Sequence, residues 1–86
     1  MNRSVVREIC VTRDDALGNV IWVLLKEKKQ REHRGEQDVL QAIISACRRF
    51  DTPGIPSDSR LKIAHDLIER RYKLVLRDLG LCITFK

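Results

Sequence analysis

The fold is decided by residues 57–85, which read SDSRLKIAHDLIERRYKLVLRDLGLCITF. Ser57 or Asp58 is suited to cap a helix at its start. Apolar residues then recur at helical spacing and form one inner face, made of Leu61, Ala64, Leu67 and Ile68. Gly80 fits the position just after a helix end, and the apolar run Leu81–Phe85 predicts a strand. We therefore expect a mixed domain in which a helix packs on a sheet.

Residues 72–77 allow two assignments. Tyr72, Val75 and Leu79 continue the helical spacing, which predicts one helix as far as Leu79. The composition of the segment, YKLVLR, favours a strand that follows a helix ending near Arg71. The sequence leaves this choice open.

The N-terminal third is rich in β-branched residues. Residues 4–12 read as a strand, residues 14–19 have turn chemistry, and the apolar run VIWVLL at 20–25 reads as a second strand. We therefore predict a β-hairpin that pairs 4–12 with 20–27. A helix over 17–29 is the alternative, because one helical face would collect Leu17, Val20, Ile21, Leu24 and Leu25.

Residues 36–50 predict a further helix. Acidic residues lie near its start and two arginines at its end, which matches the helix dipole. Its buried stripe consists of Val39, Leu40, Ile43, Ile44 and Cys47. The segment DTPGIP at 51–56 ends it, because two prolines and a glycine cannot continue a helix.

These elements predict one α+β domain over residues 1–86. We expect a small antiparallel sheet, built from the N-terminal hairpin and the C-terminal strand, with two helices packed on one face. The predicted core consists of Val6 or Ile9, Ile21, Val23, Leu40, Ile43, Ile44, Cys47, Leu61, Ala64, Ile68, Leu81 and Ile83.

Positive charge is concentrated in one part of the chain. The formal net charge is +5, and between positions 26 and 34 five basic residues face two acidic ones. Such a cluster is typical of proteins that bind nucleic acid or an acidic protein surface. A solvated loop is the alternative. The candidate binding residues are Lys26, Lys28, Lys29, Arg31 and Arg34.

The sequence favours neither a metal site, nor a cofactor, nor a catalytic centre. The three cysteines (Cys10, Cys47 and Cys82) are widely spaced, and none lies within four residues of a histidine. Their odd number favours a reduced, intracellular protein of the cytoplasm or nucleus. Cys47 lies on the apolar stripe of its helix, where a thiol is inert. The longest apolar run is six residues, so no membrane span is expected.

A resemblance covers residues 50–84. The turn Asp51–Pro56, a helix, and the segment Arg77–Thr84 resemble the N-terminal tip domain of the RNA polymerase stalk subunit, of the archaeal and RNA polymerase III type. The resemblance implies a module that docks on a polymerase, without the RNA-binding barrel of that family.

The sequence thus predicts a non-enzymatic binding module associated with nucleic-acid machinery, which contacts a polyanion or an acidic partner through its basic cluster. The alternative is a protein-interaction or inhibitor module without nucleic-acid contact. A homodimer is one form of this alternative.

Overall fold

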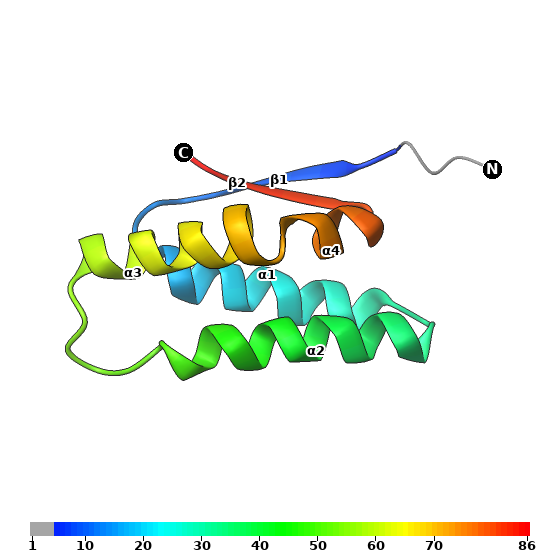
Figure 1. Cartoon of the computed structure of the whole chain (residues 1–86), viewed down its shortest axis with the longest axis horizontal. Helices are drawn as coiled ribbons and strands as arrows, with labels where there is room; N and C mark the ends of the chain where they lie inside the picture. Colours follow the sequence, from blue (N-terminus) through cyan, green and yellow to red (C-terminus); the bar gives the residue numbers. More distant parts are fainter. Residues whose placement is uncertain (1–4) are drawn as a thin grey trace.

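A computed structural model of the chain describes residues 5–86 and shows a layer of strands over a group of helices (Figure 1). The strands are the first and the last elements, and all helices lie between them in the sequence. In chain order the elements are β1 (Arg7–Val11), α1 (Ala16–Gln30), α2 (Arg34–Arg49), α3 (Ser57–His65), η1 (Asp66–Arg71), α4 (Lys73–Asp78) and β2 (Leu81–Phe85).

The predicted N-terminal hairpin is wrong, because residues 16–30 form helix α1. The helix buries Leu17, Val20, Ile21 and Leu24 on one face, which a strand with alternating sides cannot do. The segment 14–19 does not turn the chain back on itself. Asn19 instead lies in the helix, where its Nδ2 donates to the carbonyl oxygens of Asp14 (2.8 Å) and Thr12 (3.3 Å). Burial of this apolar helix face in the core therefore decides the structure of residues 20–25, despite their strand-like composition.

The antiparallel sheet is also wrong. The described residues form a sheet of two strands, β1 and β2, which run parallel in a register that pairs Arg7 with Leu81 and Val11 with Phe85. The direction follows from the helices between the strands, which return the chain to the starting end of the sheet (Figure 1). The coarser prediction is correct: the fold is α+β, with helices packed against one face of a small sheet.

The segment that follows the prolines is helical almost throughout, so residues 72–77 are not a strand. Three pieces follow one another: α3, the wider π-helical turn η1, and α4. Tyr72 marks the break between the last two, and its N–H donates to the carbonyl oxygen of Leu67 (2.8 Å), five residues earlier. Gly80 then turns the chain into β2 with a φ of 77°, a conformation that glycine adopts without strain.

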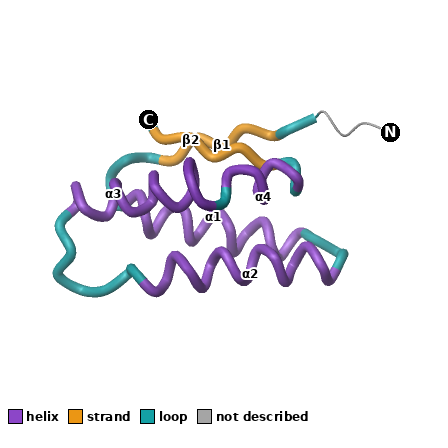
Figure 2. Tube along the Cα trace, viewed as in Figure 1, coloured by secondary structure: helices purple, strands orange, loops and turns teal. Residues whose placement is uncertain are grey.

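The helix predicted at 36–50 is confirmed as α2, which begins two residues earlier at Arg34. It packs chiefly on α1, whereas α1 and α4 contact the strands. The molecule therefore has the sheet on one side, α1 and the α3–α4 segment beneath it, and α2 farthest from the strands (Figure 2). No helix in residues 5–86 is long and apolar enough to cross a bilayer.

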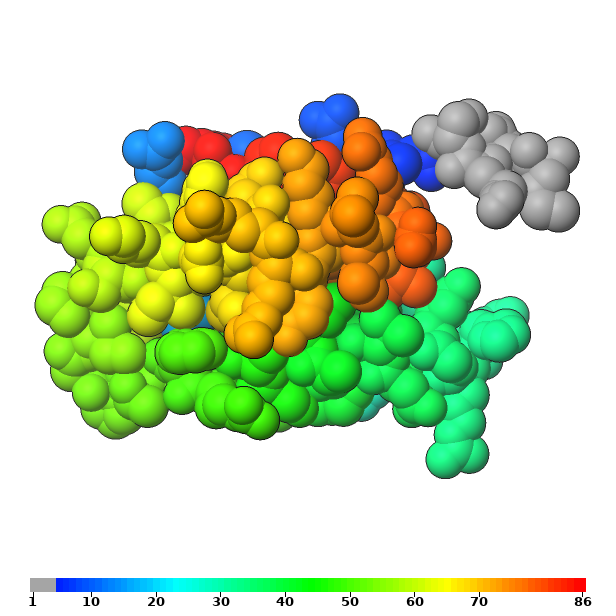
Figure 3. Space-filling model, in the orientation of Figure 1, coloured from blue at the N-terminus to red at the C-terminus, as the bar shows by residue number. Residues whose placement is uncertain are grey.

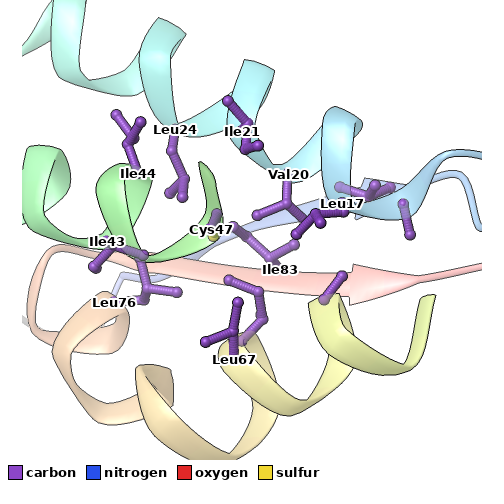
Figure 4. Close-up of a cluster of buried hydrophobic side chains, with 14 of the residues drawn as sticks. Leu17, Val20, Ile21, Leu24, Ile43, Ile44, Cys47, Leu67, Leu76 and Ile83 are labelled. Atoms are coloured by element: carbon purple, nitrogen blue, oxygen red, sulfur yellow. The ribbon is translucent and has the colours of Figure 1, made fainter. Parts of the chain in front are cut away.

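The core lies where α1, α2, the α3–α4 segment and the inner face of the sheet meet, and their buried side chains point toward one another (Figure 4). Most predicted core residues are buried, and Ile9, Val23 and Leu61 are partly buried. The residues that the prediction omitted come mainly from the helical face of α1, together with the end of β1 and the α3–α4 segment. They are Val11, Ala16, Leu17, Val20, Leu24, Leu67 and Leu76.

Candidate functional site

The most exposed large side chains of α1 share one face of the helix. Trp22, with 61 % of its surface exposed, lies one turn before Lys26 and two turns before Lys29. Leu25, also exposed, lies beside them. The ammonium group of Lys26 is 5.0 Å from the centre of the Trp22 ring, within the range of a cation–π contact. We call Trp22, Leu25, Lys26 and Lys29 the α1 face.

The other three predicted binding residues point elsewhere. Lys28 Nζ donates to Oε1 of Gln41 on α2 (2.6 Å). Arg31 lies at the end of α1, within 3.4 Å of Glu27 and 3.3 Å of Glu36. Arg34 is exposed at the start of α2. The structure therefore does not gather all five cations on one surface, and two of them, Lys26 and Lys29, lie on the α1 face.

Glu27 explains why Arg31 is not free for a ligand. Its side chain is almost fully buried beneath the sheet, where it pairs with Arg7 of β1 as well as with Arg31. A buried carboxylate needs such partners, because burial of an unpaired charge is costly. The network holds β1 against α1, and the guanidinium of Arg31 is engaged in this structural contact.

The two strands are covered unequally. In β2, the outer-face residues Cys82 and Thr84, which pair with Glu8 and Cys10, are half-buried, and residues of η1 and α4 lie beside the strand. In β1, Glu8 and Cys10 are exposed. The space-filling view shows β2 and the α3–α4 segment on the same side of the molecule (Figure 3). Among the described residues, β1 is therefore the more exposed of the two edge strands.

A shallow hollow of about 570 Å³ lies between the end of β2 and the α3–η1 helix. His65 and Phe85 stack within it, with ring centres 5.7 Å apart. Its charges are mixed, and two of them, Arg70 and Asp66, pair with each other at 3.5 Å. The hollow therefore offers no excess of one charge to select a ligand.

The structure gives Cys47 no catalytic chemistry. The side chain is fully buried, and burial raises the pKa of its thiol to about 11. The thiol therefore stays protonated near neutral pH, whereas the nucleophile is the thiolate. The described residues contain no group of three or more His, Cys, Asp or Glu side chains placed to hold a metal ion.

Comparison with known proteins identifies no relative: no family model, no curated protein and no solved structure matches the chain. The resemblance of residues 50–84 to the polymerase stalk subunit stays a prediction, and so does the association with nucleic-acid machinery. Function is therefore inferred from the side chains described above.

Sequence reasoning missed Trp22 because it placed this residue in a strand, apart from the basic cluster. The helical alternative for 17–29 contained the signal. If Leu17, Val20, Ile21 and Leu24 face the core, Trp22 must point to the opposite side, where Lys26 and Lys29 also lie.

Proposed function

We propose that the protein is a non-enzymatic interaction module that binds an acidic segment of a protein partner on the α1 face. One observation carries the proposal: Trp22 and Leu25 are exposed on the same helix face as Lys26 and Lys29, for which residues 5–86 provide no ion-pair partner. Exposed tryptophan is unusual on a free surface and enriched where proteins bind one another. The lysines add selectivity for carboxylates.

A protein partner is favoured over nucleic acid because the α1 face offers few basic side chains for contacts with phosphate. Each contact with a phosphate backbone needs its own basic side chain. Of the two guanidinium groups in the cluster, which suit phosphate best, Arg31 is held by Glu27 and Glu36, and Arg34 lies at the start of α2, off the α1 face. Lys26 and Lys29 alone would give a salt dependence of roughly −1.4 in log K against log salt for a single strand, a weak polyanion site.

Single-stranded nucleic acid is a second candidate, because a specific arrangement supports it. A base can stack on the exposed ring of Trp22 while a phosphate contacts Lys26, which lies 5.0 Å from that ring. This candidate predicts binding to an oligothymidine of twenty nucleotides that weakens with salt, with a slope of roughly −1.4 in log K against log salt. The protein candidate predicts no such binding at physiological salt.

The experiment is a selection from a displayed library of random twelve-residue peptides, followed by titration of the enriched peptides. Trp22 is the only tryptophan of the chain, so its fluorescence reports directly on the α1 face. We expect enrichment of Glu and Asp and a change in emission on binding.

The test variant is K26E/K29E, and its matched control is R48E/R49E, which makes the same charge change on exposed residues at the far end of α2. We expect the test variant to bind at least tenfold more weakly and the control to bind within twofold of wild type. Enrichment of non-acidic peptides, no enrichment, or equal loss in both variants would refute the proposal. Salt-sensitive binding of the oligothymidine alone would favour the second candidate.

A further inference from the structure

We propose that the acidic partner binds as an extended segment that adds a strand to the free edge of β1, beside the α1 face. The inference rests on the proposed function and specifies how the partner docks. Strand addition uses the backbone of a sheet edge for affinity and the side chains beneath it for selectivity.

The pattern of backbone hydrogen bonds shows which groups of β1 are free. The N–H of Arg7 donates to the carbonyl oxygen of Gly80 (2.8 Å), and the N–H of Lys86 donates to that of Val11 (3.0 Å). In a parallel pair, bonds to the neighbour come from alternate residues. Arg7, Ile9 and Val11 therefore direct their backbone groups at β2, whereas Glu8 and Cys10 direct theirs outward.

The outward edge of β1 is exposed on the side of α1, whereas residues of η1 and α4 lie beside β2. Glu8 and Cys10 are exposed, and no hydrogen bond among residues 5–86 uses their outward backbone groups. A flat, exposed edge of this kind is a template for another strand. Two strands are also fewer than an independently stable sheet normally has, so a third strand would extend the sheet on this side.

Residues of α1 lie where the side chains of an added strand would point. Glu27 marks the side of the helix that faces β1, because it pairs with Arg7. Val23 lies one turn before Glu27 and is partly exposed. Lys26 lies between Val23 and Trp22 around the helix, as the spacing of 3.6 residues per turn requires. Side chains on the helix-facing side of the added strand would contact the apolar Val23 and, farther from β1 around the helix, Lys26.

Charge complementarity favours an acidic strand over a second copy of the chain as the occupant of the β1 edge. The chain has a net charge of +5, and pairing of two copies through β1 would bring two α1 faces, each with Lys26 and Lys29, close together. Like charges in an interface cost affinity and exclude wrong partners. An acidic strand instead meets complementary charge. The side chain of Glu8 lies on the outer face of the sheet, away from α1, so the acidic positions of the partner should be those that face the helix.

Amide hydrogen exchange, measured by NMR with the peptide selected on the α1 face, tests the inference. We expect the amides of Glu8 and Cys10 to exchange at least tenfold more slowly in the complex. The amides of Ile9 and Val11, already bonded to β2, should be protected in both states. Unchanged exchange at Glu8 and Cys10, in a complex that still depends on Lys26 and Lys29, would overturn strand addition and leave the proposed function intact.

A second variant tests the same edge independently. Glu8→Pro removes one outward N–H without touching the bonds to β2, and an edge strand tolerates proline at such a position. Glu8→Val keeps the N–H and serves as the control. We expect at least tenfold weaker binding for Glu8→Pro than for Glu8→Val, with circular dichroism unchanged. Equal affinity, or a dimer of the free protein in light scattering that Glu8→Pro abolishes, would refute an acidic strand as the occupant.

Discussion

Replacement of Glu27 by glutamine tests whether the contact between β1 and α1 depends on a buried charge. Glu27 lies under the sheet with 8 % of its side chain exposed and pairs with Arg7 and Arg31. Glutamine keeps the shape and one oxygen acceptor but removes the charge. The change therefore isolates the ionic part of the network.

The two ion pairs should contribute unequally. Arg31 keeps 19 % of its side chain exposed, so its pair with Glu27 is partly shielded from water, and loss of a charged hydrogen bond of this kind costs roughly 1–2 kcal/mol. Arg7 keeps 55 % exposed, and solvent screening limits that pair to about 0.5 kcal/mol. We expect Glu27→Gln to lower the free energy of unfolding by about 1.5–2.5 kcal/mol.

Urea unfolding followed by helical circular dichroism measures this effect. With a urea dependence of about 1 kcal/mol per molar for a domain of this size, the midpoint should fall by roughly 2 M. Double-mutant cycles with Arg31→Gln and Arg7→Gln separate the two pairs, and the coupling to Arg31 should exceed that to Arg7. A midpoint shift below about 0.3 M, or no coupling to Arg31, would contradict this account of Glu27.

Three further predictions concern other parts of the fold. Burial raises the pKa of the Cys47 thiol from 9.0 to about 11. The stability that the protonated thiol contributes is therefore present below pH 9 and is lost as the pH rises through 11. Urea titrations should show that wild type loses about 2 kcal/mol more stability than Cys47→Val over this range. Arg60 donates to Asp15 (2.7 and 3.0 Å) and to Asp51 (2.7 Å), contacts that raise its pKa. Arg60→Lys removes the planar group that contacts both carboxylates and should lower the melting temperature by roughly 4–8 °C. An unchanged melting temperature would show that these contacts do not stabilise the fold. Gly80→Ala places a side chain at a φ of 77° and should cost about 1–2 kcal/mol, measured by the same urea titration; a neutral effect would mean that the turn relaxes.

Most of the C-terminal third could be assigned from the sequence because local signals agree there, except over residues 72–77, where helical spacing and strand-like composition disagree. The helical spacing from Leu61 to Ile68, the glycine at 80 and the apolar strand after it all indicate the observed elements. In the segment 17–29 the signals conflict. Its β-branched residues favour a strand, whereas the spacing of its apolar residues from Leu17 to Leu24 favours a helix, and burial of this face in the core decides between them.

The binding surface was only partly predictable for the same reason. The basic residues are visible in the sequence, but Arg31 is held by Glu36 on the next helix and by Glu27 beneath the sheet. The contact with Glu36 arises from packing between elements, whereas Glu27 lies one turn before Arg31, a spacing that is recognisable once this segment is assigned as a helix. Trp22 joined the surface only once the helical phase of α1 was known. Composition therefore identified the charge, whereas the fold determined which charges remain free.

The pairing of β1 with β2 also bears on how the chain acquires its structure. Arg7 meets Leu81, so almost the whole described chain must be arranged before the two strands can join. Contacts between residues so far apart close large loops and tend to form late during folding. The helices would then assemble first and the sheet last. Substitutions in β1 should chiefly accelerate unfolding and leave the folding rate nearly unchanged.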